Sequence, residues 1–208
     1  MPGKAAHASK RREGVSALDK LMVLVHALEE DEWERNSGET DPLMTALGLP
    51  YPTIIGTIEG GDWASTVMDR VTVDGRYGVR LGDSWRDAEA SLRRTIERAA
   101  ASDPWLHDHP PTLEITGGRF SSARTDPDHE LVTTLGNAAE AVLGRRPPIA
   151  GAPYGADMRL LVNEGATPTV IFGPGDARVA HAADEHVPLA QVVDCARVLA
   201  EWIARGLA

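Results

Sequence analysis

The chain is 208 residues long, carries a formal net charge of −10 and has a hydrophobic fraction of 42%. This composition suits a globular protein with a real core, and the acidic balance excludes the basic surface that nucleic-acid binding requires. The single cysteine, Cys195, excludes a disulfide framework, and we expect a buried structural thiol. No apolar run reaches the roughly 20 residues that span a bilayer and no secretory segment opens the chain, so we expect a cytoplasmic protein without membrane contacts.

Four segments repeat apolar residues at the spacing of an amphipathic helix. The sequence therefore predicts helices over residues 14–30, 85–101 and 128–143 and from residue 188 onward. Ser84 and Asp87 have the spacing of a capping box before the second of these helices. Residues 31–50 are polar and predict a long surface loop.

Four short segments rich in β-branched residues predict strands over residues 52–59, 69–78, 113–116 and 169–172. The last of them, Thr-Val-Ile-Phe, is typical of a strand that is buried on both faces of a parallel sheet. We expect an α+β sandwich over residues 1–116 and α/β structure over residues 117–208, so the predicted fold class is α/β (α+β). Gly117 and Gly118 mark the boundary between the two parts.

None of the seven histidines has the His-x-x-x-His spacing of a helical metal site. His181 stands out because it follows the predicted buried strand and its Gly-Pro-Gly turn, a place where ligand sites of open α/β sheets gather. A zinc ligand oriented by Asp184 and Glu185 fits this position, and so does a polar loop that caps a helix. His26 lies close to the apolar face of the first helix, and we expect a core or boundary histidine.

Two further segments carry residues suited to binding. His7 lies in Gly-Lys-Ala-Ala-His-Ala-Ser, whose small side chains would let a substrate or another chain approach the imidazole closely. Asp157 and Arg159 lie in Tyr-Gly-Ala-Asp-Met-Arg, where the guanidinium fork is suited to a substrate carboxylate. A helix-entry loop with a chance histidine fits the first pattern equally, and a surface salt bridge at a helix start fits the second.

The segments that carry His7, Asp157, Arg159 and His181 occur in the same order as similar segments of a known protein family. The chain resembles the dinuclear zinc deacylases and peptidases that include acetylornithine deacetylase, succinyl-diaminopimelate desuccinylase and carboxypeptidase G. The resemblance begins at the segment around His7 and continues through Ile-Glu-Gly-Gly-Asp-Trp-Ala-Ser-Thr-Val (58–67) and Asp-Pro-Trp-Leu (103–106). It ends with Tyr-Gly-Ala-Asp-Met-Arg and Gly-Pro-Gly…Ala-His-Ala-Ala-Asp-Glu, so that it covers essentially the whole sequence.

The resemblance implies a domain organisation and a metal. Residues 1–116 correspond to a ferredoxin-like dimerisation (lid) domain whose first strand is expected to be truncated, and residues 117–208 to the C-terminal portion of the catalytic domain. His181 matches a ligand of one of two metal ions, expected as Zn²⁺ with Co²⁺ or Mn²⁺ as alternatives. His7 matches a lid histidine that enters the active site of the partner in a homodimer and stabilises the tetrahedral oxyanion.

The resemblance also implies substrate-binding residues. Arg159, next to Asp157, matches an arginine that contacts a substrate carboxylate, and Gly173 and Gly175 match the turn that lines the site. Thr66 stands where many members carry an asparagine that grips a carboxylate. The implied substrate is a small N-acylated amino acid or a related amide.

The sequence departs from the family pattern in what it lacks. Met68 stands in the place of a proline in the lid strand. The family's His-x-Asp ligand pair, its bridging aspartate and the glutamate pair that includes the general base have no counterpart in this sequence. Because a hydrolytic zinc site needs about three protein ligands per metal and a base, we expect this chain to be inactive unless a missing N-terminal half supplies the rest.

Two functional hypotheses follow. In the first, the chain is a fragment of a two-metal hydrolase that cleaves an N-acyl group from an amino acid or related amine. In the second, it is a non-catalytic dimerising or partner-binding module that has lost the metal site. The two differ in whether His7, Arg159 and His181 are needed for function.

Overall fold

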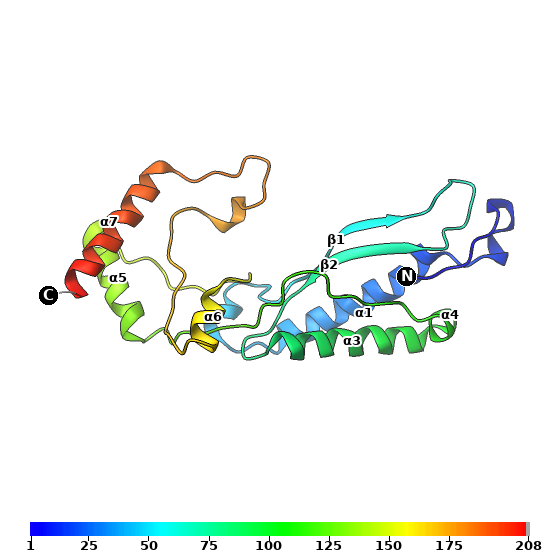
Figure 1. The fold of residues 1–208 in the computed structure, drawn as a ribbon, viewed down its shortest axis with the longest axis horizontal. Helices are drawn as coiled ribbons and strands as arrows, with labels where there is room; N and C mark the ends of the chain where they lie inside the picture. Colours follow the sequence, from blue (N-terminus) through cyan, green and yellow to red (C-terminus); the bar gives the residue numbers. More distant parts are fainter. Residues whose placement is uncertain (207–208) are drawn as a thin grey trace. The chain divides into compact units, whose positions relative to one another are not determined.

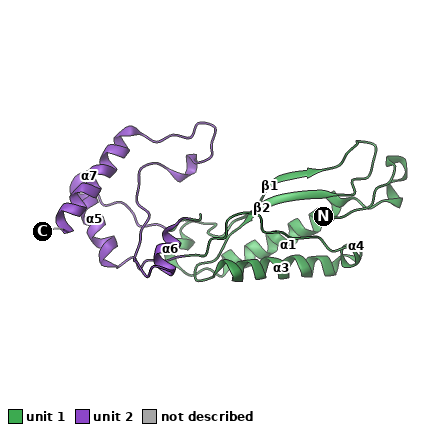
Figure 2. Cartoon of the chain, in the orientation of Figure 1, with its two compact units in different colours: residues 1–122, 151–155 green, residues 123–150, 156–208 purple. Residues whose placement is uncertain are grey.

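The computed structural model describes residues 1–206 and divides into two compact units (Figures 1 and 2). Unit 1 comprises residues 1–122 together with residues 151–155, and unit 2 comprises residues 123–150 and 156–208. The sequence places a domain boundary after residue 116, whereas the division into compact units falls after Ser122. The chain then returns briefly to unit 1 at residues 151–155 before it completes unit 2.

The helices and strands follow one another in a fixed order along the two units. Unit 1 contains η1 (Ala8–Glu13), α1 (Ala17–Ser37), α2 (Pro42–Thr45), β1 (Thr53–Gly60), β2 (Val71–Tyr77), α3 (Trp85–Ser102) and α4 (Pro104–Asp108). Unit 2 contains α5 (Glu130–Leu143), α6 (Met158–Asn163), η2 (Ala177–Val179) and α7 (Leu189–Gly206). None of the helices described over residues 1–206 combines the length and the apolar character needed to cross a membrane.

The four long predicted helices are present as α1, α3, α5 and α7. The predicted capping box at the start of α3 is confirmed, with reciprocal bonds between Ser84 and Asp87. The loop predicted over residues 31–50 is wrong in its first part, because α1 continues to Ser37. Asp31 and Arg35 lie on the buried face of that last stretch, where they pair with each other, so polar composition does not end the helix.

The sheet of unit 1 is an antiparallel hairpin of β1 and β2, with an irregularity in the register between Ile55 and Thr57. The N-terminal segment runs beside the residues that precede β2. The Gly3 amide donates to the Asp69 carbonyl at 2.7 Å, and an antiparallel bridge pairs His7 with Thr66. Gly3 is required in this segment, because a Cβ there would lie 2.5 Å from the Val15 carbonyl oxygen.

Helix α1 forms the centre of unit 1, where it packs against both the sheet and α3 (Figure 1). Towards the sheet, Leu21 joins Ala17 and Val71 in one buried cluster. Towards α3 and α4, Leu24 joins a second cluster that contains the fully buried Leu106. Leu21 and Leu24 are three residues apart and therefore lie on the same side of α1, which contributes one leucine to each cluster.

The core of unit 2 lies between α5 and α7. Its buried residues are Leu135, Ala138, Ala139 and Val198. Trp202 packs against this cluster, and its indole N–H donates to Thr134 Oγ1 at 3.0 Å. Cys195, expected to be fully buried, is half-buried on α7.

The strands predicted over residues 113–116 and 169–172 are not formed within the described residues. Val170 and Phe172 pack on the α5–α7 cluster, whereas Ile171 is 51% exposed, so that this segment is buried on one face and not on two. Thr125 holds it in place through its hydroxyl, which accepts from the Thr169 amide at 3.0 Å. A β-branched run becomes a strand only when a neighbouring strand supplies the ladder, and residues 1–206 supply none to either segment.

Candidate functional site

His7 is the residue immediately before η1 and caps that helix. Its side chain is exposed, and its Nδ1 accepts a hydrogen bond from the Ser9 amide at 3.2 Å. The Ser9 hydroxyl lies 2.8 Å from the same nitrogen. On the other side, the backbone of His7 bridges to Thr66. The structure therefore brings together two candidate residues that are far apart in the sequence, at one edge of unit 1.

The loop that leads to Thr66 carries an exposed aromatic side chain. Trp63 is 66% exposed, and its carbonyl oxygen accepts from the Thr66 amide at 3.1 Å. Met68 packs against the buried Ala17–Leu21–Val71 cluster. Its carbonyl oxygen also accepts from the Ala17 amide at 2.8 Å, so this methionine joins the segment before β2 to the start of α1.

Asp157 and Arg159 lie at the beginning of α6 in unit 2. Asp157 occupies the N-cap position and is exposed, and within the described residues its side chain makes no capping hydrogen bond. Arg159, two residues further along the chain, is half-buried. The two residues thus come from the start of one short helix, which the sequence offers only as the alternative to a binding loop.

Gly173, Gly175 and His181 lie in the long connection between α6 and α7. Gly175 has a φ of 98°, and its amide donates to Gln191 Oε1 at 2.9 Å, which fastens the turn to α7. His181 is exposed and adopts a left-handed backbone with a φ of 63°. Its amide donates to Glu185 Oε2 at 3.1 Å, so Glu185 is engaged by the backbone of the candidate ligand.

The described residues do not complete a metal centre. Over residues 1–206, no group of three or more His, Cys, Asp or Glu side chains gathers closely enough to hold a metal ion. His181 offers one imidazole, which falls short of the three or four ligands of a protein zinc site. Nearby, a hydrogen bond from Arg178 lowers the pKa of the exposed Asp176 to about 2, so that this carboxylate is already occupied by a cation.

His26, expected near the core, is exposed instead. Leu24, two residues earlier, faces the interior, and two residues correspond to about 200° around a helix, which turns His26 outward. There it lines a shallow surface pocket with Trp33 and three glutamates.

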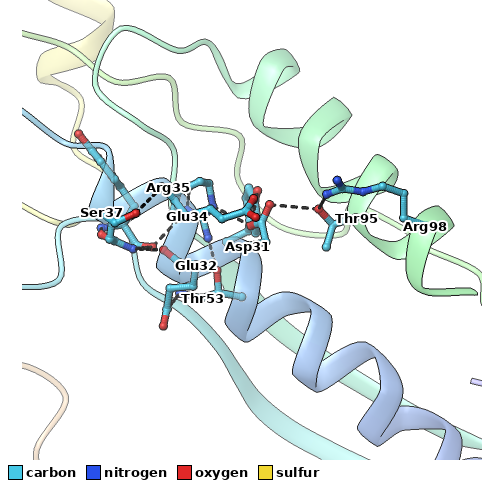
Figure 3. Close-up of polar contacts among 12 residues, drawn as sticks. Asp31, Glu32, Glu34, Arg35, Ser37, Thr53, Thr95 and Arg98 are labelled. Carbon is cyan, nitrogen blue, oxygen red and sulfur yellow. Dashed lines mark hydrogen bonds and ion pairs between the residues drawn. The ribbon is translucent and has the colours of Figure 1, made fainter. Parts of the chain in front are cut away.

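A buried polar network in unit 1 escapes the sequence analysis (Figure 3). Its centre is Arg35, which is 7% exposed. The Nε of Arg35 donates to Asp31 Oδ2 at 2.7 Å, and Nη2 donates to Thr53 Oγ1 at 2.6 Å. Nη1 donates to the carbonyl oxygens of Tyr51 and Gly78, at 3.1 and 2.9 Å. The i,i+4 spacing of Asp31 and Arg35 was the available signal, hidden by the expectation of a loop.

The same network holds two tyrosines in their neutral form. The Tyr77 hydroxyl donates to Asp31 Oδ2 at 2.8 Å, and the Arg35 guanidinium lies 4.0 Å from the Tyr77 ring centroid. Burial raises the pKa of Tyr77 to about 12. Burial, with a hydrogen bond to Glu39, likewise raises the pKa of Tyr51 to about 12. These groups tie the C-terminal end of α1 to the start of β1 and the end of β2, which is the opposite end of the hairpin from His7.

Comparison with solved structures shows which class of protein shares this mixture of helices and a small antiparallel sheet. A metallo-carboxypeptidase from Sulfolobus solfataricus superposes with a TM-score of 0.69 over 96% of this chain and 55% of its own, at 15% identity. A tripeptidase from Staphylococcus aureus superposes with a TM-score of 0.64 over 97% of this chain and 48% of its own, at 20% identity. The chain therefore shares the fold of the matched portions of these two peptidases.

Sequence comparison identifies the family. The model of peptidase family M20/M25/M40 matches residues 7–205, and the chain belongs to this family. An acetylornithine deacetylase from Myxococcus xanthus is 38% identical over 97% of this chain and 50% of its own length. An N-formyl-4-amino-5-aminomethyl-2-methylpyrimidine deformylase from Halalkalibacterium halodurans is 24% identical over 95% of this chain and 47% of its own. The chain spans about half the length of the curated relatives it matches.

Proposed function

We propose that this chain forms the lid and the C-terminal catalytic portion of a hydrolase that removes an acyl group from the nitrogen of an amino acid or related amine. Family membership supports hydrolysis. Two of the matched relatives are named for the removal of a formyl or an acetyl group, which supports a small acyl group over a peptide. The solved neighbours are peptidases, so a linear amide bond is the common element.

The observation that carries the proposal is the placement of His7. It is exposed, its imidazole is fixed by the cap on η1, and its backbone is pinned to Thr66. When water attacks an amide carbonyl, negative charge develops on the oxygen, and a preorganised donor stabilises that charge without having to reorganise. His7 would serve as this donor in the active site of a second copy, with Thr66 beside it. Arg159 would bind the substrate carboxylate through its guanidinium fork.

The second copy would associate through the sheet edge and helix of unit 1. Within the described residues β1 pairs only with β2, so the other edge of β1 presents unpaired backbone groups. Ile54 and Ile58 on this strand are 59% and 55% exposed. An edge with exposed isoleucines favours pairing with an identical edge in a homodimer.

The metal of the proposed enzyme, expected as zinc, would be held by His181 together with ligands from residues beyond these 208. Measuring the intact mass of the protein made by its own cell tests this point. A species of about twice the mass of this chain that contains its peptides supports a single longer enzyme. A species of this chain's mass, found without any co-purifying polypeptide and without hydrolase activity, favours a non-catalytic dimerising module.

The role of His7 is tested by His7→Ala in the protein as its cell assembles it, with N-acetylated and N-formylated amino acids as substrates. We expect turnover to fall by roughly 10²–10³, the usual effect of losing one oxyanion donor. His129→Ala is the matched control. His129 also caps a helix through Nδ1, at the start of α5 in unit 2, and its loss should leave turnover unchanged. An unchanged rate for His7→Ala would refute the oxyanion role.

A further inference from the structure

The hydrogen bonds around His7 carry information on where its proton lies. The Ser9 amide can only donate, so the Nδ1 atom that it approaches at 3.2 Å must accept. In a neutral imidazole one ring nitrogen accepts and the other donates. The proton of His7 therefore resides on Nε2.

The neighbouring hydroxyl is compatible with this assignment but does not decide it. Ser9 Oγ lies 2.8 Å from Nδ1, and a hydroxyl can donate or accept. The backbone amide is thus the group that selects the tautomer, while the hydroxyl adds a second bond to the same nitrogen. Both bonds hold Nδ1 over the first turn of η1, so that Nε2, across the ring, points away from that turn.

The start of α5 repeats the arrangement and shows that it is a capping geometry. There the Leu131 amide donates to His129 Nδ1 at 3.0 Å, again from two residues further on. Leucine has no hydroxyl, so this cap works through the backbone alone. His129 is therefore an internal reference for what a capping amide does to an imidazole in this chain.

We propose that Ser9 is a positioning residue that fixes His7 as the Nε2–H tautomer, so that the imidazole presents a hydrogen-bond donor to the substrate oxyanion. The proposal rests on the proposed function for its catalytic meaning. With the opposite tautomer, Nε2 would present a lone pair and repel the developing negative charge. The hydrogen bond from the Ser9 amide thus makes Nε2 a hydrogen-bond donor before the substrate binds, although either ring nitrogen of a free imidazole can carry the proton.

The test is a long-range ¹H–¹⁵N correlation spectrum of the histidine side chains of the ¹⁵N-labelled protein at mildly alkaline pH, where imidazoles are neutral. His7→Gln and His129→Gln assign the two spin systems. We expect His7 Nδ1 to resonate as an unprotonated nitrogen and Nε2 as a protonated one, as for His129. A protonated Nδ1 in His7 would overturn the proposal.

Two variants separate the amide from the hydroxyl. Ser9→Ala keeps the amide, and we expect it to keep the tautomer. Ser9→Pro removes the amide N–H at a first-turn position, where helices tolerate proline, and we expect His7 to shift to the mixture of tautomers of an unrestrained imidazole. The unchanged His129 pattern reports that the fold of unit 2 persists, and an unchanged Thr66 amide shift reports the same for the His7 edge. If Ser9→Pro leaves the His7 tautomer unchanged in a folded protein, the Ser9 amide does not fix that tautomer and the proposal is refuted.

The turnover assay tests the oxyanion role of His7, and the spectra test its tautomer, so either proposal can be refuted without the other. If His7→Ala leaves turnover unchanged while the spectra show the Nε2–H tautomer, the oxyanion role is wrong and the cap is only structural. If His7→Ala lowers turnover while Nδ1 is protonated, the catalytic role stands and the proposed tautomer is wrong. If both hold, Ser9→Pro should lower turnover in the direction of His7→Ala, and Ser9→Ala should retain most of it.

Discussion

The two units of the molecule place their candidate residues on very different supports. In unit 1, His7 lies on a backbone-paired edge, and the unit also contains two apolar clusters and a buried polar network around Arg35. Unit 2 presents His181 on an exposed connection, and its core is confined to α5 and α7. On α7, Leu189 is 80% and Ile203 is 55% exposed. The contrast indicates that the two units differ in stability. A substitution in unit 1 should therefore lower the free energy of unfolding of its unit by more than a matched substitution in unit 2.

The largest effect should come from the buried ion pair of unit 1. Arg35→Ala leaves Asp31 buried without its cation and removes one donor from each of the Tyr51 and Gly78 carbonyls, so the free energy of unfolding of unit 1 should fall by about 3–5 kcal/mol. Amide hydrogen exchange of α1 and α3 measures this loss separately from unit 2. Arg93→Ala, which breaks an exposed i,i+4 pair with Glu89, is the control and should cost roughly 0.5 kcal/mol or less. Similar losses for the two variants would contradict the stabilising role of Arg35.

A matched pair of leucines compares the two cores directly. Leu106 is fully buried in unit 1, whereas Leu135 in unit 2 is 8% exposed beside two alanines. Leu106→Ala should cost about 3 kcal/mol through lost burial and a cavity, and Leu135→Ala about 2 kcal/mol, because the thinner core can close around it. Hydrogen exchange in α3 and in α5 measures each loss within its own unit. A larger loss at Leu135 would reverse the ranking of the two units.

Alkaline pH should weaken unit 1 selectively. The pKa values of Tyr51 and Tyr77 are raised to about 12, above their ordinary value of 10. Because the folded state disfavours the ionised form, this stability is fully present below pH 10 and is lost as the pH rises towards 12. The loss should be at most about 3 kcal/mol per tyrosine. Urea unfolding between pH 9 and 12 checks it, and Tyr77→Phe should flatten the curve while it keeps the ring under Arg35.

The smallest effect concerns the helix starts. Ser84 caps α3 through a full capping box, whereas Asp157 makes no capping bond with its side chain among the described residues. Ser84→Ala should therefore cost about 1 kcal/mol in unit 1, and Asp157→Ala should leave the stability of unit 2 nearly unchanged. Thermal unfolding resolves the first effect. A clear loss of stability for Asp157→Ala would contradict this expectation and would mean that α6 depends on the Asp157 side chain.

Much of the fold was predictable because helices are local. The apolar stripes of α1, α3, α5 and α7 repeat within the sequence, and each of these four helices overlaps its predicted segment, although α1 continues to Ser37. Strands depend on partners, so the same β-branched composition yields β1 and β2 but no strand at residues 169–172. The end of α1 was missed because Asp31 and Arg35 look like loop residues until their buried partners are known.

The candidate site was predictable as a set of residues but not as a geometry. His7 and Thr66 were singled out separately, and only the register of the N-terminal segment pairs them. Ser9 carried no signal, because its contribution comes from a backbone amide that every residue except proline possesses. His7, Thr66, Arg159 and His181 all remain predictions as site residues, since their roles depend on ligands and partners outside residues 1–206.

The left-handed backbone of His181 affects which residues this position can accept during evolution. Glycine adopts that conformation freely, whereas a side-chain-bearing residue gives up about 1–2 kcal/mol to hold it. Selection for folding alone therefore favours glycine at this position. If the His181 imidazole binds the metal as proposed, descendants that use it should keep histidine at this position, and those that no longer use it should be free to accept glycine.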